Sequence, residues 1–273
     1  MADQTLTLMA VHAHPDDESI STGGILARYA DEGIRTVLVT CTNGELGDAP
    51  GGIKPDNPDH DEQVVVPLRL SELEASCAVL GVQHLELLGY HDSGMEGWPQ
   101  NLLPDAFWNT PVEVAAAKLA DLMRIYQPDV VVTYDEHGFY GHPDHIQANR
   151  ITHAAIEQCQ IPSKLYYTGI ARSGIKAFRQ TLVEHGIVPP SEVEEDPEFG
   201  TPDELITTVV DCVAYAPRKF ASLQAHASQS DNIFFLQMGE EMFAGIMGTE
   251  SFVRVLDRTA APTPEDDLFA GLR

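Results

Sequence analysis

Three consecutive valines, residues 130–132, constrain the fold of this chain more than any other feature. They lie in the run Asp129-Val130-Val131-Val132-Thr133-Tyr134, which is β-branched through its middle and apolar on both faces. A strand of this kind is typical of the centre of a parallel sheet, because helices then cover both sides. The sequence therefore predicts an α/β fold with a mostly parallel sheet.

Earlier apolar runs extend the same pattern. Residues 6–11 and 36–41 each predict a buried strand, and residues 19–33 carry a helical apolar stripe that ends at Gly33. A strand, a helix and a strand form a βαβ unit, whose strands run parallel with a right-handed crossover. Residues 84–88 predict a third strand, so the amino-terminal half alternates strands with helices.

Prolines and glycines predict where the helices begin and end. Pro67 is expected to start a helix that Gly81 ends, which places Arg69 near its first turn. Thr110-Pro111-Val112-Glu113 has the form of a capping box, and Pro143 suits the first position of another helix. Further along, the sequence predicts strands at residues 164–167, 205–212 and 252–256, and helices at 174–185, 217–227 and 238–246.

We find no internal repeat and no linker that would divide the chain, so its 273 residues are expected to form a single domain. Residues 1–170 would form the core that carries the functional site. Residues 171–260 would add smaller C-terminal α/β elements that complete a substrate pocket. Residues 261–273 are expected to be a frayed tail.

Composition excludes several classes of partner. The net charge of −26 repels phosphate backbones and anionic membrane surfaces, so neither nucleic acid nor a membrane is expected as a partner. Four widely spaced cysteines form no C-x-x-C pair and are expected to be reduced, as in an intracellular protein. With no leader and no apolar run of about 18 residues, the protein is expected to be soluble and cytoplasmic. Homo-oligomerisation is left open.

The first polar cluster, Ala13-His14-Pro15-Asp16-Asp17-Glu18, follows the first predicted strand. The carboxyl ends of parallel strands are where open α/β sheets bind their ligands. His14 and Asp17 are three residues apart, so one turn can direct both toward a metal ion, while Asp16 points elsewhere and is free to act as a base. The alternative interpretation is that these acids only stabilise the start of a helix.

The second polar cluster lies directly after the central strand, at residues 135–145. His14 and Asp17 together with His145 would give two histidines and one carboxylate, the ligand set of a catalytic zinc ion with one open position. Ferrous iron is compatible with the same set. Such a metal suits amide hydrolysis, with Asp16 as the general base.

Other polar residues of these loops complete the predicted site. His142, oriented by Asp144, and Tyr140 would stabilise the oxyanion or protonate the departing amine. Asp92 follows the third strand and is a candidate for gripping substrate hydroxyls. Glu45 follows the second strand in a Gly-rich loop that either reaches a polar ligand or is a plain turn.

Taken together, these motifs resemble the LmbE-like family of zinc de-N-acetylases, also called the PIG-L family. The resemblance covers roughly the first 150 residues and also includes Arg69 followed by Glu72. It implies a Rossmann-like three-layer fold, zinc on His14, Asp17 and His145, Asp16 as general base, and His142 and Tyr140 near the oxyanion. Arg69 and Asp92 would then bind the sugar. A weaker likeness at residues 219–229 matches the mycothiol-related members.

We therefore expect a metal-dependent deacetylase that acts on a small N-acetylglucosamine-type substrate. The conjugate amidases of the mycothiol branch tend to carry Lys where this chain has Ser21, so Ser21 favours the biosynthetic deacetylase and is expected to contact the substrate. An amidase that cleaves thiol conjugates is the alternative within the enzymes. A nonenzymatic Rossmann-like module with a structural metal is the alternative of another class. Residues 49–66 and 187–204 would shape the part of the site that binds the group attached to the sugar. They carry no recognisable motif, so the sequence leaves the identity of this group open.

Overall fold

A computed structural model describes residues 5–185 and 199–273 of the chain. In this part of the chain, seven strands form one sheet in the order β3-β2-β1-β4-β5-β7-β6. The first five strands of this order run parallel, and β7 pairs antiparallel with both β5 and β6. The predicted α/β class with a mostly parallel sheet is confirmed. The strands are β1 (Thr7–His12), β2 (Arg35–Thr42), β3 (His84–Tyr90), β4 (Val130–Thr133), β5 (Lys164–Gly169), β6 (Thr208–Asp211) and β7 (Thr249–Asp257).

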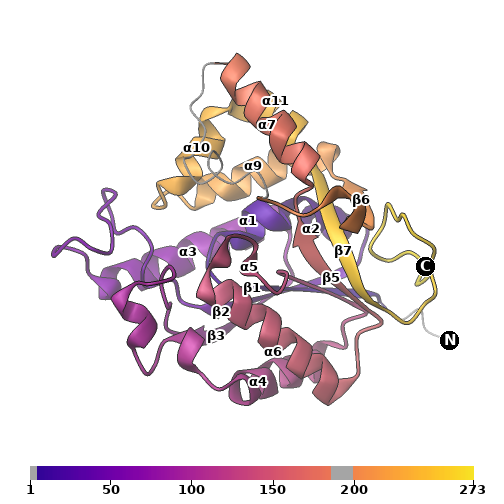
Figure 1. Cartoon of the computed structure of the whole chain (residues 1–273), viewed down its shortest axis with the longest axis horizontal. Coiled ribbons are helices and arrows are strands. Elements are labelled where there is room, and N and C mark those ends of the chain that lie inside the picture. The colour runs from indigo at the N-terminus through magenta and orange to yellow at the C-terminus, as the bar shows by residue number, and fades with distance from the viewer. Residues whose placement is uncertain (1–4, 186–198) are drawn as a thin grey trace.

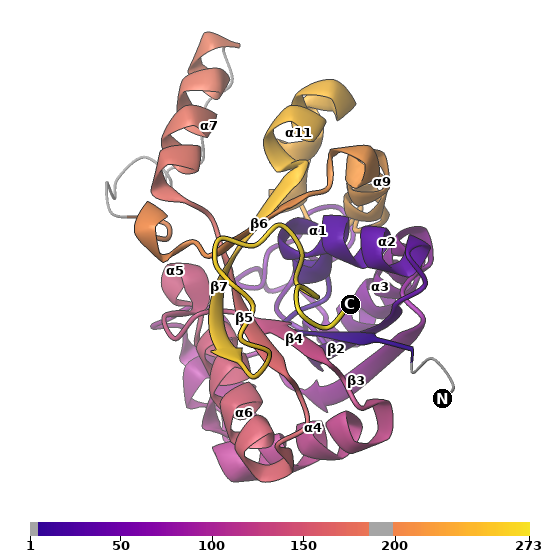
Figure 2. The same ribbon diagram turned by 90° about the vertical axis from the view of Figure 1, so that its right-hand side faces the viewer.

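Helices cover both faces of the sheet and form the three layers (Figures 1 and 2). One face carries α4 (Val112–Tyr126) and α6 (Pro143–Cys159). The other carries α2 (Gly23–Asp31) and α3 (Glu62–Leu80), preceded by the short α1 (Asp17–Ser21). The remaining helices are α5 (Gly138–Gly141), α7 (Arg172–Glu184), α9 (Ala216–Ala225), α10 (Asp231–Gln237) and α11 (Gly239–Met247).

Short 3-10 turns connect several of these elements: Pro99–Leu102, Phe107–Asn109, Asp203–Leu205 and Val213–Tyr215. Among the helices of the described residues, none combines the length and the apolar character needed to cross a bilayer.

Alternation along β1 builds a core on each side of the sheet. Leu8 and Ala10 belong to the core under α2 and α3, whereas Met9 and Val11 belong to the core under α4 and α6. All four side chains are fully buried. Successive side chains of a strand point to opposite faces, so a central strand must be apolar throughout when helices cover both.

The order of the strands places a crevice beside β1. The chain proceeds outward from β1 to β2 and β3 and then returns to β4, which pairs with the other edge of β1. In open α/β sheets, ligands bind outside the carboxyl ends of the strands at such a reversal of strand order. Both predicted polar clusters follow these two strands.

Two helix starts differ from the prediction. α3 begins at Glu62 and not at Pro67, because the Asp61 side chain caps the helix by accepting the Gln63 N–H at 3.0 Å. Pro67 therefore lies inside the helix. The predicted capping box before α4 is wrong, since Pro111 is the cap residue and no side chain caps this helix.

The helix predicted at residues 19–33 is divided into α1 and α2 at Thr22. The buried Thr22 hydroxyl lies 2.8 Å from Nε2 of His12. At the other end of the chain, the single helix predicted near residues 238–246 is preceded by a second one, α10. Residues 187–198, which belong to a segment expected to shape the substrate site, lie outside the described residues.

The last residues are packed and not frayed. Leu268 and Phe269 are fully buried, and the Phe269 ring lies 5.0 Å from the ring of Tyr29 in α2. The Tyr29 hydroxyl also donates to Asp267 at 2.8 Å. Sequence reasoning missed this packing because the apolar residues of the tail are too few to show a period.

A buried acid ties this tail to the sheet. Glu265 accepts hydrogen bonds from Lys164 at 2.6 Å, from Tyr166 at 2.8 Å and from Thr208 at 2.9 Å. The Lys164 and Glu265 side chains are 0% and 1% exposed. Burial acts to raise the pKa of Glu265, but these hydrogen bonds outweigh it and hold that pKa below its usual value.

Replacing Glu265 with Gln is expected to lower the free energy of unfolding by about 3 kcal/mol, because Lys164 then loses its buried counter-charge. A carboxylate with a lowered folded-state pKa stabilises the fold above its unfolded pKa of about 4.3, and this stabilisation is lost as the pH falls through the folded value. Urea unfolding at neutral pH and near pH 4 measures both effects. The difference between wild type and Glu265→Gln should shrink at the lower pH.

The matched control is Glu113→Gln, which changes an exposed acid in the first turn of α4. It should alter the free energy of unfolding by less than about 0.5 kcal/mol. An equal effect of both variants would contradict the role given to the buried pair.

Candidate metal centre and active site

The parallel pairing of β1 with β4 brings the two polar clusters together. Oδ2 of Asp17 lies 3.4 Å from Nδ1 of His14, and Oδ1 of Asp17 lies 3.6 Å from Nε2 of His145. The ring centroids of His14 and His145 are 5.3 Å apart. The three residues predicted as metal ligands are therefore neighbours, although they come from distant parts of the sequence.

A group of three buried histidines, which has His142 in place of Asp17, also has donor atoms close enough together to hold a divalent metal ion. The ring nitrogens of His14, His142 and His145 lie within 4.8 Å of one another, and the three residues are buried. Within the described residues, Nε2 of His145 is buried with no hydrogen-bond partner, while Nδ1 lies 3.3 Å from the Gly138 carbonyl oxygen. Burial lowers the pKa of His145 to about 4, which keeps the ring in the neutral form that binds metal.

Tyr134 and Asp144 hold the proposed ligands in place. The Tyr134 hydroxyl donates to Oδ2 of Asp17 at 2.6 Å, and its ring stacks on His145 with centroids 4.0 Å apart. Oδ2 of Asp144 lies 3.2 Å from Nε2 of His14, on the side of the ring away from Asp17. A carboxylate on one nitrogen commonly orients a histidine whose other nitrogen binds metal.

Sequence reasoning missed Tyr134 and the partner of Asp144. The only signal for Tyr134 was a hydroxyl-bearing aromatic at the end of the most apolar strand. Ser93 holds the Asp144 carboxylate, donating its N–H at 2.8 Å and its hydroxyl at 2.5 Å. Ser93 lies in the turn after β3, which was singled out for Asp92 alone.

Asp16 has an unusual backbone conformation. Its φ of 123° lies in a region that residues other than glycine rarely adopt, at a cost of order 1–3 kcal/mol. Its Oδ2 accepts from Nη2 of Arg69 at 3.1 Å, so this one oxygen of the carboxylate is directed to Arg69. Burial raises the pKa of Asp16 to about 6, opposed by the charge of Arg69 and reinforced by that of Asp17. A carboxylate with this pKa can accept a proton near neutral pH.

His142 lies beside the cluster and caps α6. Its ring centroid is 4.5 Å from that of His14 and 5.0 Å from that of His145. Nδ1 accepts the Asp144 N–H at 3.1 Å, so the neutral ring carries its proton on Nε2. His142 is thus oriented by the backbone of Asp144, whereas the Asp144 carboxylate, expected to orient it, faces His14 and Ser93.

Tyr140 lies at the mouth of the site. Its side chain is 45% exposed, and its ring centroid is 5.0 Å from that of His145. The preceding Phe139 has a φ of 64°. A bulky residue held in this region indicates that the surrounding structure fixes the loop that presents Tyr140.

The four residues predicted to bind substrate differ in how they are placed. Asp92 is 4% exposed, and its Oδ1 lies 3.7 Å from Nε2 of His14, at the edge of the metal cluster. Burial acts to raise the pKa of Asp92, but His14 holds it below the usual range. Glu45 is also buried and accepts the Asp92 N–H at 2.9 Å. Ser21 is half-buried at the end of α1.

Arg69 lies beneath the site and not at its surface. It is 4% exposed, and its guanidinium donates to the carbonyl oxygens of Pro15 at 2.5 Å and Gly44 at 2.9 Å as well as to Asp16. These bonds join the loop after β1 to the loop after β2. The close approach also explains two glycines, because a Cβ at Gly44 or Gly47 would lie within 2.5 Å of the guanidinium.

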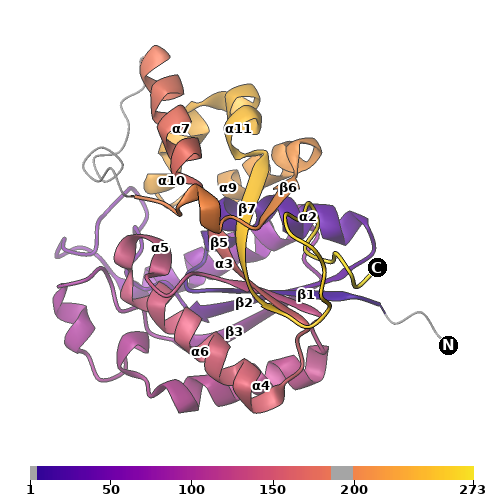
Figure 3. The ribbon, with the colours of Figure 1, turned by 45° about the vertical axis from the view of Figure 1, so that its right-hand side comes forward.

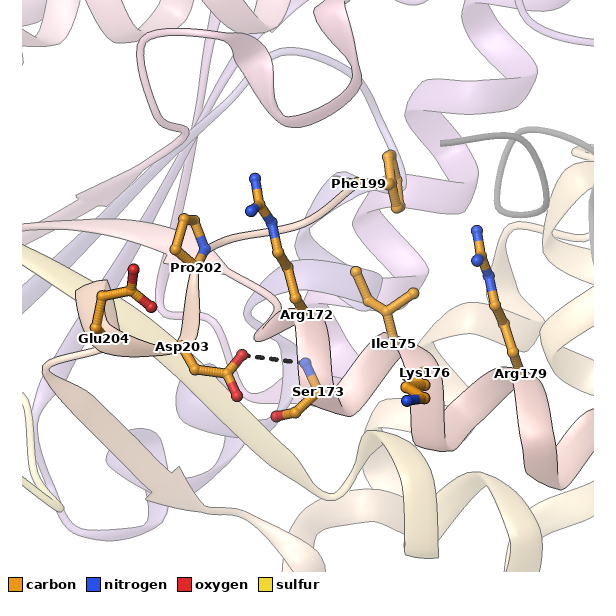
Figure 4. A pocket seen from close by; sticks show the side chains of 9 residues that line it. All are labelled: Arg172, Ser173, Ile175, Lys176, Arg179, Phe199, Pro202, Asp203 and Glu204. Atoms are coloured by element: carbon orange, nitrogen blue, oxygen red, sulfur yellow. Dashed lines mark hydrogen bonds between the residues drawn. The ribbon is translucent and has the colours of Figure 1, made fainter. Parts of the chain in front are cut away.

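The C-terminal elements α7, α9, α10 and α11 gather on one side of the molecule (Figures 1 and 3). A pocket of about 700 Å³ lies along α7, where Arg172, Ile175 and Arg179 point to the same side toward Phe199 (Figure 4). The Phe199 ring lies 5.1 Å from that of Phe139, beside the loop that presents Tyr140. The pocket therefore reaches the loop that presents Tyr140 through Phe199, although none of the predicted site residues lines it.

A metal-binding cluster of histidine and carboxylate at the carboxyl edge of a Rossmann-like sheet, with a neighbouring acid free of the cluster, defines the class of metal-dependent hydrolases. The profile of the PIG-L family, described as GlcNAc-PI de-N-acetylase, matches residues 9–156. This chain belongs to that family, and the predicted class, a hydrolase that removes N-acetyl groups, is confirmed.

Among its relatives is a 1D-myo-inositol 2-acetamido-2-deoxy-alpha-D-glucopyranoside deacetylase of Acidothermus cellulolyticus. The two share 45% identity over 97% of this chain and 95% of the relative. The fold resembles the N,N'-diacetylchitobiose deacetylase from Pyrococcus horikoshii, with a TM-score of 0.58, 19% identity, and 91% of this chain and 83% of that chain covered.

The fold also resembles a 4-carboxy-2-hydroxymuconate hydratase from Pseudomonas putida, with a TM-score of 0.59 and 19% identity over 94% of this chain and 99% of that chain. At these identities the two structures establish the fold alone. The side chains at the site, and not the fold, must therefore carry the argument for the reaction.

Replacing His145 with Ala is expected to lower the affinity for a divalent metal by more than about 100-fold, since losing a ligand costs more than losing an outer partner. Isothermal titration calorimetry of the metal-free protein with Zn²⁺ or Co²⁺ measures this affinity. His137→Ala is the matched control, because His137 lies in the same loop with its side chain 83% exposed. Equal affinities of the two variants would exclude His145 as a ligand.

Proposed function

We propose that this chain is a zinc-dependent deacetylase that hydrolyses the N-acetyl group of an N-acetylglucosaminyl-inositol. The convergence of His14, Asp17 and His145 beside Asp16 is the observation that carries the reaction. The near full-length similarity to the Acidothermus deacetylase supports the choice of substrate.

His14, Asp17 and His145 would hold the metal, which when bound lowers the pKa of a water molecule to about 7 and polarises the amide carbonyl. Zinc suits two nitrogens and one carboxylate, and ferrous iron is the alternative. Tyr134 keeps Asp17 in place, and Asp144 keeps His14 in place.

Asp16 takes the proton of the attacking water as the general base. The Tyr140 hydroxyl donates to the carbonyl oxygen as negative charge develops on it. The proton that Asp16 has taken passes to the amine nitrogen as the C–N bond breaks, while the neutral His142 donates a hydrogen bond from Nε2 to the oxyanion. Water is consumed, and acetate and a free amino sugar are released.

For the sugar, we propose that Asp92 accepts hydrogen bonds from hydroxyl groups and that Glu45 fixes Asp92 through its N–H. Ser21 lines the approach from α1. Arg69 acts on the sugar through Asp16 and the two loops it joins, because its guanidinium is already engaged by them. The C-terminal elements of the single domain, residues 171–260, complete the pocket through Phe199. The substrate is a soluble metabolite of the cytoplasm.

Asp16→Ala is expected to lower kcat for acetate release by about 100-fold to 10,000-fold, since the general base is lost. The metal content should stay near one ion per chain, because Asp16 is not a ligand. Acetate release from N-acetylglucosaminyl-inositol, with metal analysis of the same samples, tests both. Unchanged turnover would contradict the mechanism.

The deacetylase and the conjugate amidase differ in the substrate that they cleave faster. Wild-type protein should release acetate from N-acetylglucosaminyl-inositol faster than it cleaves a cysteinyl-glucosamine amide. The opposite order would favour the conjugate amidase.

Chelation should abolish turnover before it lowers the melting temperature markedly. A collapse of the fold on metal removal, with no turnover at all, would favour a structural metal. Reloading with Zn²⁺ or Fe²⁺ then compares the two metals.

Tyr140→Phe is expected to lower kcat by about 100-fold with KM nearly unchanged, because the hydroxyl acts on charge that develops only in the transition state. Tyr167→Phe removes a hydroxyl on β5 that lies 2.5 Å from Nε2 of His153, and serves as the control. A rise in KM with kcat preserved would instead place Tyr140 in ground-state binding.

A further inference from the structure

A buried acid–histidine pair joins the catalytic loop to the C-terminal part of the chain. Glu18 lies in α1, directly after Asp17, and His226 caps the end of α9. Nε2 of His226 lies 2.7 Å from Oε1 of Glu18, and both side chains are 0% exposed. The hydroxyls of Ser19 and Ser76 donate to the same oxygen at 2.8 Å and 2.5 Å.

The second oxygen of Glu18 holds the backbone of Asp16. Oε2 accepts the Asp16 N–H at 3.0 Å. Asp16 is the residue with a φ of 123°, a conformation that persists only where the surroundings impose it. The Asp16 N–H therefore keeps its acceptor only in one orientation of the Glu18 carboxylate. The groups that bind Oε1 fix this orientation.

His226 is itself held by the turn that follows it. Ser228 donates its N–H and its hydroxyl to the carboxylate of Glu72 in α3, at 2.8 Å and 2.7 Å. Gln229 accepts the Asp48 N–H at 3.1 Å. This turn is thus fastened both to α3 and to the loop after β2, so the His226 ring reaches Glu18 from a fixed position.

Attachment of α9 to the core does not require this pair. Phe220 of α9 packs with its ring 5.1 Å from that of Phe243 in α11, and Arg218 of α9 donates to the Val79 carbonyl oxygen in α3 at 2.9 Å. A buried ion pair adds little net stability compared with apolar residues of the same volume. The pair instead provides a fixed direction for the Glu18 carboxylate, which apolar packing would not.

We propose that His226 is a positioning residue for the hydrolysis: it orients Glu18, and Glu18 holds Asp16 in the conformation that directs its carboxylate toward the reacting water. The inference rests on the proposed function in its use of Asp16 as the base. It assigns a role in catalysis to the segment at residues 226–229, about 200 positions away from the loop it supports.

The test compares His226→Ala, His226→Gln and Phe220→Leu in the zinc-loaded full-length protein, with N-acetylglucosaminyl-inositol as substrate. His226→Ala should lower kcat by about 10-fold to 100-fold with KM within about twofold and metal content unchanged. His226→Gln, whose amide nitrogen can still donate to Glu18, should recover to within about fivefold of wild type. Phe220→Leu perturbs the packing of the same helix without touching Glu18 and should keep the kcat of wild type.

A double variant separates direct from indirect action. If His226 acts through Glu18, then His226→Ala combined with Glu18→Gln should be no slower than the slower single variant. Additive losses would overturn the inference. So would a His226→Ala enzyme with the kcat of wild type, loss of its metal, or no recovery in His226→Gln.

Crystal structures of wild type and His226→Ala make the inference testable without turnover. In the variant, Asp16 should leave its positive φ or its carboxylate should shift away from Arg69. An unchanged Asp16 would overturn the positioning role. Failure of the wild type to release acetate, with Asp16 shifted in the variant, would instead reject the proposed substrate and keep the positioning role.

Discussion

The parallel pairing of β1 with β4 is the contact on which the rest of this structure depends. It joins two strands that are apolar on both faces, and it lies where the strand order reverses. Because the carboxyl ends of both strands face the same crevice, the loops that follow them deliver His14, Asp17 and His145 to one point. A shift of one strand by one residue would turn its side chains to the opposite face of the sheet and separate the predicted ligands.

Buried polar side chains around this point are supported in chains of contacts. Tyr134 holds Asp17, Asp144 holds His14, and Ser93 in turn holds Asp144. Burying a polar group without a hydrogen-bond partner costs free energy. The site therefore requires these supporting groups as well as the predicted ligands that they hold. Within the part of the chain that the structure describes, Nε2 of His145 is buried without a hydrogen-bond partner, and this nitrogen faces Asp17.

Sequence reasoning succeeded where a local pattern has one structural meaning and failed where a contact depends on distant residues. The apolar runs predicted the strands, and the polar clusters at their ends predicted which residues meet. The start of α3 was misplaced because Asp61, a better cap, precedes Pro67. The contacts of Arg69 with Pro15, Asp16 and Gly44 were not predicted, because nothing in its neighbours along the chain reveals them.

By itself, the sequence determined the class of fold, the family and the chemistry of the candidate site, because strand periodicity and motif spacing are local properties. Only the tertiary structure decided which side chains hold the predicted site residues in place. It placed the Asp144 carboxylate on His14, packed the last residues against α2, and brought His226 to Glu18. These contacts join residues far apart along the chain, and their geometry follows from packing of the whole fold, which no local pattern records.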